Sequence, residues 1–146
     1  SSSWMQNTAP TNSVYSVASG TYAFNRSGND IIAYCFAPVA GYSAFGKFKS
    51  NNSSDNAFVF LGFRPRFLMI KGDYSTGSWY LIDTARDPGN IAEEILKAET
   101  SAAEATSGLV DVLSNGFKFR FNLGTYDVLY MAFAETPFQA NGGLAR

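Results

Sequence analysis

The stretch GFKFRFN at residues 116–122 alternates apolar and polar side chains. Because successive residues of an extended chain point to opposite faces, its three phenylalanines share one face while Lys118, Arg120 and Asn122 share the other. Such a strict period of two predicts a β-strand that is buried on one side and solvated on the other.

Short apolar runs separated by turn residues occupy most of the remaining chain. Turn signals such as RSGND, NNSSDN, RDPGN and SNG recur at intervals of about 8–12 residues. The chain also contains 13 Phe and 8 Tyr, which favour strands over helices. Together these features predict an all-β sandwich or barrel.

Several runs predict particular places in a sheet. DIIAYCFA at residues 30–37 and YDVLYMAFA at residues 126–134 are apolar on both faces, which is typical of central strands. AFVFLGF at residues 57–63 and RFLMIKG at residues 66–72 are predicted to pair with each other around Pro65. Proline cannot donate a ladder hydrogen bond and therefore suits the corner between them.

Residues 90–105, NIAEEILKAETSAAEA, depart from this pattern because they are rich in Ala, Glu and Lys. Local propensity favours a helical turn or two at residues 91–98, with Asn90 as the N-cap. The alternative within a sandwich is a loop over the edge of the sheet.

Two segments of the chain align with each other without a gap. FNRSGNDIIAYCFA at residues 24–37 matches FNLGTYDVLYMAFA at residues 121–134, and each predicts a hairpin that ends in a buried strand. Self-similarity of this kind indicates repeated units. Within a single domain of 146 residues, residues 1–40 then resemble the closing half of a preceding repeat, and residues 44–146 form a full unit. A half unit cannot bury its own apolar face, so it must pair with the rest of this chain or with another chain.

The composition argues against several classes of function. Charged residues make up only 16% of the chain and the net charge is −1, which argues against nucleic-acid binding and against a membrane-surface role. No apolar stretch is long enough for membrane insertion. The chain has no His, so a Ser-His-Asp or Cys-His site cannot be built. Its one cysteine, Cys35, lies in an apolar run and is predicted to be a small buried hydrophobe.

The stretch GSWYLIDTAR at residues 77–86 contains a candidate ligand-binding pair, Trp79 and Asp83. An exposed tryptophan can stack on a sugar ring, and a carboxylate can accept hydrogen bonds from sugar hydroxyls. The structural alternative places Trp79 and Leu81 in the core and pairs Asp83 with Arg86 across the following turn. The sequence leaves both interpretations open.

Two polar loops supply further candidate binding residues. Tyr74 lies in GDYST, and Asn51, Asn52 and Asp55 lie in SNNSSDN. Binding residues concentrate on loops held by a rigid scaffold, and this composition is typical of adaptable recognition loops. Solvated turns are the alternative.

Charged residues elsewhere give weaker signals. Arg64 and Arg66 flank Pro65 and are interpreted as a strand corner, with an interface as the alternative. Asp30 and Asp127 occupy equivalent places in the repeat, but no clustered calcium loop surrounds either. The glutamates of residues 90–105 are interpreted as a solvated face rather than as paired catalytic acids. We therefore expect no metal, no cofactor and no enzymatic activity.

An ordered series of motifs carries a family resemblance. The series comprises GYSAFGKF, GFRPRFLMIK, WYLIDTAR, LSNGFKFR and YMAFAETPF, and the resemblance extends from about residue 4 to the C-terminus. In this series the chain resembles tailed-bacteriophage virion proteins that are often labelled tail fibre, or described as SPRY or concanavalin A-like domains of unknown function. It departs from them at FKSNNSSDN, where the family usually has a glycine-rich stretch similar to YTGNG.

The resemblance implies an antiparallel β-sandwich of the concanavalin A-like or jelly-roll-like class, with nine or ten strands and at most one short helix. It implies a non-enzymatic virion surface module, similar to a tail fibre or spike, that contacts the host envelope. The expected partners are copies of itself in a homo-oligomer (trimers are common among such fibres), other virion proteins and a host surface glycan. A purely structural module that self-assembles or decorates a capsid is the alternative.

The predicted core gathers the apolar residues of all these strands. It comprises Ile32, Tyr34, Phe36, Phe60, Phe67, Met69, Trp79, Leu81, Phe117, Phe119, Phe121, Leu129, Met131 and Phe133.

Overall fold

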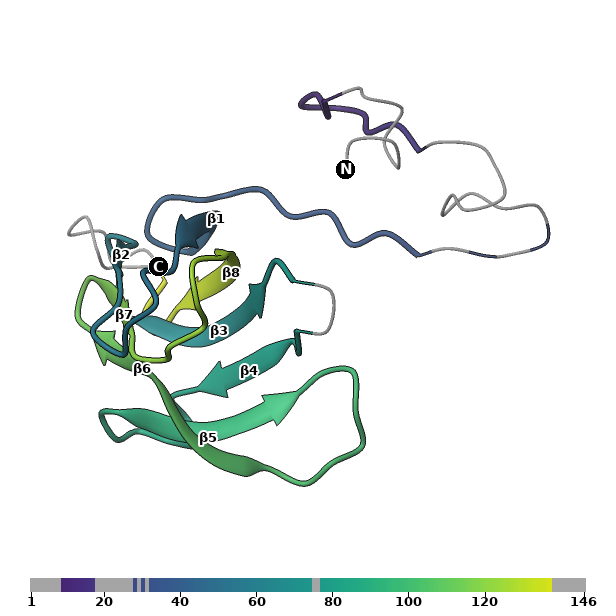
Figure 1. Cartoon of the computed structure of the whole chain (residues 1–146). Helices are drawn as coiled ribbons and strands as arrows, with labels where there is room; N and C mark the ends of the chain where they lie inside the picture. Colours follow the sequence, from purple (N-terminus) through teal and green to yellow (C-terminus); the bar gives the residue numbers. More distant parts are fainter. Residues whose placement is uncertain (1–8, 18–27, 29, 31, 75–76, 138–146) are drawn as a thin grey trace. The chain divides into compact units, whose positions relative to one another are not determined.

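The computed structural model describes residues 9–17, 28, 30, 32–74 and 77–137. The chain divides into two units, Ser1–Phe36 and Ala37–Arg146. The described residues of the second unit contain eight strands and no helix (Figure 1). The strands are β1 (Ser43–Lys49), β2 (Phe58–Phe60), β3 (Pro65–Gly72), β4 (Tyr80–Asp83), β5 (Ala92–Lys97), β6 (Ala105–Leu113), β7 (Gly116–Phe119) and β8 (Asp127–Ala134).

All eight strands belong to one antiparallel sheet, in the order β1-β8-β3-β4-β5-β6-β7-β2. The sheet curls far enough that β1 contacts β7, because the ring of Phe48 lies 5.3 Å from that of Phe119 and 6.0 Å from that of Phe117. The all-β antiparallel prediction is confirmed. The described strands form a nearly closed, barrel-like sheet rather than the expected two-layer sandwich of nine or ten strands.

The core lies on the inner face of this curled sheet. The stretch GFKFRFN behaves largely as its alternation predicts, since Phe117 and Phe119 are buried. Phe121 is exposed, because β7 ends at Phe119. The remaining inner-face positions are apolar side chains from every strand except β1, where Phe48 is partly buried against them. These core residues include Val59, Leu68, Ile70, Ile82, Ala92, Ile95, Leu109, Val110, Val112, Val128, Ala132 and Ala134.

In the central strands, the side chains that were predicted to form the core do not lie on the inner face of the sheet. Leu68, Ile70 and Ile82 are 1% exposed, whereas the predicted Met69 and Leu81 are only half-buried. Both sets are apolar, so hydrophobicity cannot identify the inner face, and a shift of one residue exchanges the two faces. Phe67, Met131 and Phe133 are misassigned in the same way, and Phe60, Trp79 and Leu129 are exposed, as are Ile32, Tyr34 and Phe36 in the first unit.

The misassigned side chains form a second apolar surface, here called the outer face. One row of it crosses five strands through the cross-strand neighbours Phe45, Met131, Met69, Leu81 and Leu96. Beside this row, the ring of Phe133 lies 5.8 Å from Tyr42, 5.8 Å from Phe45 and 6.3 Å from Phe67. An antiparallel sheet that leaves one face to water normally carries polar residues there, so this composition is unusual.

Two predicted strand arrangements are wrong. β2 and β3 do not pair with each other: β2 pairs with β7, while β3 pairs with β4 and β8. The connection between them turns at Gly62, whose positive φ of 78° suits glycine, and the amides of Leu61 and Gly62 bond to the carbonyl of Asn115. Likewise β7 and β8 are not neighbours, so residues 121–134 do not form the predicted hairpin.

The two matching apolar runs differ in the structure. YDVLYMAFA is confirmed as a central strand, since β8 lies between β1 and β3. In the first run, the described residues 32–38 form no strand, and Cys35 is exposed rather than buried. Most of the preceding residues of that repeat, 18–27, lie outside the described residues.

The stretch expected to contain a helical turn is a strand, β5. It forms ladders with β4 and β6, and its residues Ala92 and Ile95 reach the core. A bulge occurs between Ala92 and Glu94, and the carboxylate of Asp87 accepts hydrogen bonds from the amides of Glu93 at 2.6 Å and Glu94 at 3.0 Å. Tertiary pairing therefore overrides the local helical propensity here.

Acidification is expected to weaken this bulge. The hydrogen bonds from the amides of Glu94, Glu93 and Gly89 hold the pKa of Asp87 below its ordinary value. A depressed carboxyl pKa stabilises the fold at neutral pH, and this contribution is lost as pH falls from about 5 through the folded-state pKa. In Asp87→Asn the fall in melting temperature between about pH 5 and pH 3 should be smaller than in the parent. An unchanged pH profile, measured by circular dichroism, would contradict this assignment.

Candidate functional site

Three segments meet at one end of the sheet: residues 50–57, residues 73, 74 and 77–79, and residues 120–126. Backbone hydrogen bonds join them, from Ser50 to Tyr126 at 2.9 Å, from Asn52 to Gly124 at 3.2 Å and from Asp73 to Asp127 at 2.7 Å. The candidate residues Asn51, Asn52, Asp55, Tyr74 and Trp79 all belong to this end, here called the loop end. The remaining candidates, Asp83, Arg64 and Arg66, belong to the opposite end.

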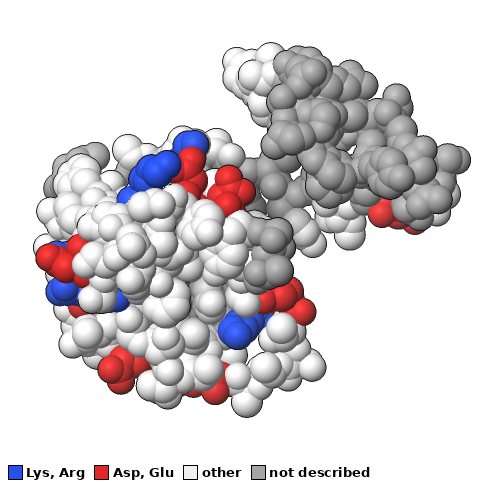
Figure 2. Space-filling model, viewed as in Figure 1, with Lys and Arg blue, Asp and Glu red and all other residues white. Residues whose placement is uncertain are grey.

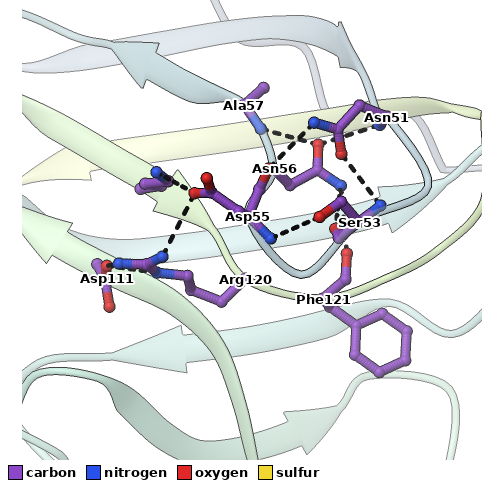
Figure 3. Close-up of polar contacts among 9 residues, drawn as sticks. Asn51, Ser53, Asp55, Asn56, Ala57, Asp111, Arg120 and Phe121 are labelled. Atoms are coloured by element: carbon purple, nitrogen blue, oxygen red, sulfur yellow. Dashed lines mark hydrogen bonds and ion pairs between the residues drawn. The ribbon is translucent and has the colours of Figure 1, made fainter.

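The loop at residues 50–57 is built around the buried side chain of Asn56 (Figure 3). Its Oδ1 accepts hydrogen bonds from the amides of Asn51 at 3.2 Å and Ala57 at 2.8 Å. Its Nδ2 lies 2.7 Å from Ser50 Oγ, 3.1 Å from the Ser53 carbonyl and 3.3 Å from the Phe121 carbonyl. One side chain thus fixes the loop and joins it to the segment between β7 and β8. The sequence analysis missed Asn56, because nothing local distinguishes it from the other asparagines of SNNSSDN.

Two of the predicted loop residues are already engaged. The side-chain Nδ2 of Asn51 donates to the Asp55 carbonyl at 3.0 Å, and its Oδ1 accepts a hydrogen bond from the backbone amide of Ser53. The carboxylate of Asp55 pairs with Lys118 and, at 3.6 Å, with Arg120. The hydrogen bond from Lys118 lowers the pKa of Asp55. Both side chains therefore have structural roles in the loop.

Asn52 differs from its neighbours. Its backbone is left-handed, with φ of 59°, a conformation that asparagine tolerates better than most residues. Its side chain is exposed and makes no hydrogen bond within the described part of the chain. Asn52 therefore presents a free amide at the loop end.

Aromatic side chains also lie at the loop end. Trp79 is 39% exposed, and the ammonium group of Lys71 lies 5.0 Å from its ring centre. The rings of Tyr74 and Tyr126 lie 5.3 Å apart, and Tyr126 is 47% exposed. We call Tyr74, Trp79 and Tyr126 the aromatic strip. Burial is the main cause that raises the pKa of Tyr74, so its phenol is neutral at physiological pH.

The strip depends on local features of the chain. Gly72 lies under the Tyr74 ring, and a Cβ at that position would overlap the ring. The carboxylate of Glu99 accepts a hydrogen bond from the Trp79 amide at 3.0 Å. Hydrogen bonds from the Ser78 side chain and the Trp79 backbone lower the pKa of Glu99, which places an ionised carboxylate beside the strip. Tyr126 was missed by the sequence analysis, because NLGTYD reads as an ordinary turn.

The structural alternative for Trp79 and Asp83 is wrong in both parts. Trp79 is exposed, and neither Trp79 nor Leu81 lies in the core. Asp83 pairs with Arg66 at 3.7 Å rather than with Arg86, which pairs with Glu104. Asp83 lies at the opposite end of β4 from Trp79, so the structure does not bring these two candidate ligand-binding residues together.

Arg64 and Arg66 form an ion cluster at that opposite end. Arg64 lies 2.9 Å from Glu135 and donates to the Val112 carbonyl at 3.0 Å, while Arg66 lies 3.9 Å from Glu135. These contacts join the start of β3 to the residue after β8 and to β6. The corner interpretation agrees with this cluster.

The described surface carries few charges, and on the face in Figure 2 they form small, separated clusters among uncharged residues. Among residues 9–17, 28, 30, 32–74 and 77–137, no three His, Cys, Asp or Glu side chains are close enough to bind a metal ion. Asp127 pairs with Lys47 at 2.7 Å. In the same residues, no helix is long and apolar enough to cross a membrane.

Comparison with known protein families gives one match. The model of a domain of unknown function, DUF7483, matches residues 1–137. The chain belongs to the DUF7483 family. No curated protein and no solved structure matches the chain significantly.

The DUF7483 match includes both units of the chain, the aromatic strip and the ion cluster. Within this DUF7483 domain, the loop end provides two exposed aromatic rings, a free amide and an ionised carboxylate on a hydrogen-bonded framework. Such groups can stack on an apolar ring face and bond to hydroxyls.

Proposed function

We propose that the chain is a bacteriophage virion surface module, similar to a tail fibre or spike, that contacts the host envelope without catalysing a reaction. The single observation that supports this most directly is the aromatic strip, with Trp79 and Tyr126 exposed at the loop end. The motif series that resembles phage virion proteins supports the same proposal.

A host surface glycan is the ligand class that best fits the strip. Sugar rings present C–H faces that stack on Trp and Tyr, and their hydroxyls bond to amides and carboxylates such as Asn52 and Glu99. The loops are held by backbone hydrogen bonds to residues 124–127, at and just before the start of β8, so little ordering entropy is lost on binding. The low charge content of the chain as a whole, 16% of its residues with a net charge of −1, suits a neutral polysaccharide better than a polyanion.

Trp79→Ala is expected to weaken binding to host-cell surface polysaccharide by about ten-fold, because a stacked ring contributes roughly 1 kcal/mol or more. Glycan arrays followed by calorimetry on the purified chain would measure this. Phe60→Ser is the matched control, since Phe60 is 68% exposed but lies on β2, away from the strip. The proposal fails if the chain binds no host surface component and is absent from purified virions.

We also propose that the sheet is one layer of a concanavalin A-like or jelly-roll-like sandwich with nine or ten strands. The support is the apolar outer face, where Phe45, Met69, Met131 and Phe133 are only half-buried. A second layer of strands would remove these side chains from water.

A purely structural assembly module is the second candidate function, and it is compatible with the first. The observation that favours it is the exposure of apolar side chains in the first unit: Ile32 and Tyr34 are 80% exposed and Phe36 is 54% exposed. Side chains of this kind usually mark an interaction site. Light scattering over a wide concentration range would detect a homo-oligomer such as a trimer, and a monomer at every concentration with residues 1–40 packed within their own chain would remove this candidate.

A further inference from the structure

Residues 30–37 resemble β8 in sequence: three of the eight positions are identical, and the other five are apolar in both segments. Asp30, Phe36 and Ala37 are identical to their counterparts Asp127, Phe133 and Ala134 in the gap-free alignment. The buried residues of β8 are Val128, Ala132 and Ala134, with Tyr130 partly buried beside them. Their counterparts Ile31, Cys35, Ala37 and Ala33 are all apolar and small enough for an inner face.

The two segments have opposite surroundings. β8 forms ladders with β1 and β3 along its length. Residues 32–37 form no ladder in the described structure, and Ile32, Tyr34, Cys35 and Phe36 are all exposed. A strand that is apolar on both sides is typically covered on both faces.

We propose that residues 30–37 are the β8-equivalent strand of a second sheet of this family, and that they insert between a β1-like and a β3-like strand of that sibling unit. This inference deepens the assembly role proposed above and rests on it. The partner is therefore a protein unit of the same fold that accepts a strand, which is a form of β-strand addition.

The structure also specifies one property of the partner. Tyr130 lies opposite Gly46 of β1, and a Cβ at Gly46 would lie 2.7 Å from Tyr130 Oη. The absence of a side chain at Gly46 therefore leaves room for the ring of Tyr130. The counterpart of Tyr130 in the first segment is Ala33, which needs no glycine opposite it. We expect the β1-like strand of the partner to carry a larger residue than glycine there, so the best partner is a sibling unit rather than an identical copy.

Placing the sequence of residues 30–37 at the position of β8 tests the proposal directly. The five substitutions V128I, L129I, Y130A, M131Y and A132C give β8 the sequence of residues 30–37. The transplanted chain is expected to keep one cooperative unfolding transition, measured under reducing conditions. Adding G46V should raise its melting temperature by about 4 °C, because valine suits a strand better than glycine. In the parent chain G46V should lower it by about as much.

Several results would overturn the proposal. One is a transplanted chain that fails to fold with either glycine or valine at position 46. Another is a G46V substitution that lowers the melting temperature equally in the transplanted chain and in the parent chain. An independent readout is the rate at which Cys35 reacts with a thiol reagent in the dilute parent chain, where we expect the rate of a free thiol. Protection there would mean that the segment packs within its own chain. None of these measurements involves a glycan, so failure of the strip to bind sugar would leave this inference intact.

Discussion

Asn56→Ala is expected to lower the free energy of unfolding by about 3 kcal/mol. The side chain is 5% exposed and satisfies the amides of Asn51 and Ala57 and the carbonyls of Ser53 and Phe121. Alanine leaves these groups without a partner in a space that the loop closes. Each unsatisfied buried polar group costs roughly 1–3 kcal/mol, and partial entry of water offsets some of the total. Urea denaturation followed by circular dichroism measures the change.

Asn52→Gly is the matched control for this prediction. Asn52 lies in the same loop, but its side chain is exposed, and its positive φ suits glycine. We expect its effect on stability to be within about 0.5 kcal/mol. If Asn56→Ala were equally mild, the hydrogen bonds of Asn56 would not organise the loop.

Phe117→Ala is expected to cost about 4 kcal/mol, the largest effect among the single substitutions considered. Phe117 is fully buried, and its ring lies 6.0 Å from that of Phe48 on β1 and 5.7 Å from that of Tyr130 on β8. The substitution therefore opens a cavity where the two ends of the curled sheet meet. Because a domain of this size is stabilised by only about 5–15 kcal/mol, the variant should unfold at markedly lower urea concentration.

Phe58→Ala is the control for the loss of an aromatic ring on the neighbouring strand. Phe58 is 47% exposed, so we expect less than about 1 kcal/mol. A cost for Phe117→Ala no larger than that of Phe58→Ala would mean that the sheet does not close around Phe117.

The strands were predictable where the polarity of the sequence alternates. GFKFRFN has one apolar face, and Phe117 and Phe119 are buried as expected. Where both faces are apolar, as in RFLMIKG and YDVLYMAFA, the sequence predicted the strand but not which face is inside. The order of strands was not predictable either, because β2 and β3 are neighbours in sequence yet lie far apart in the sheet.

The candidate site was predictable only in part, for a similar reason. Trp79 is exposed as the sugar-stacking interpretation requires, and Tyr74 lies in a loop whose composition suggested recognition; both belong to the loop end. The partners of Asp83 and Asp55 are distant in sequence, so the sequence offered no means of finding Arg66 or Lys118. The structural role of Asn56 was not predictable either, because nothing in its local sequence distinguishes it from the other asparagines of the loop.

The position of β8 has a consequence for how the chain folds. β8 is the last strand in sequence, yet it joins β1 to β3 in the sheet, and its ion pair with β1 spans 80 residues. Contacts of such high sequence separation form slowly, because a long loop must close before any of them stabilises the chain. Until β8 emerges from the ribosome, the edges of β1 and β3 are therefore open, and a β8-like segment of a neighbouring chain competes for them.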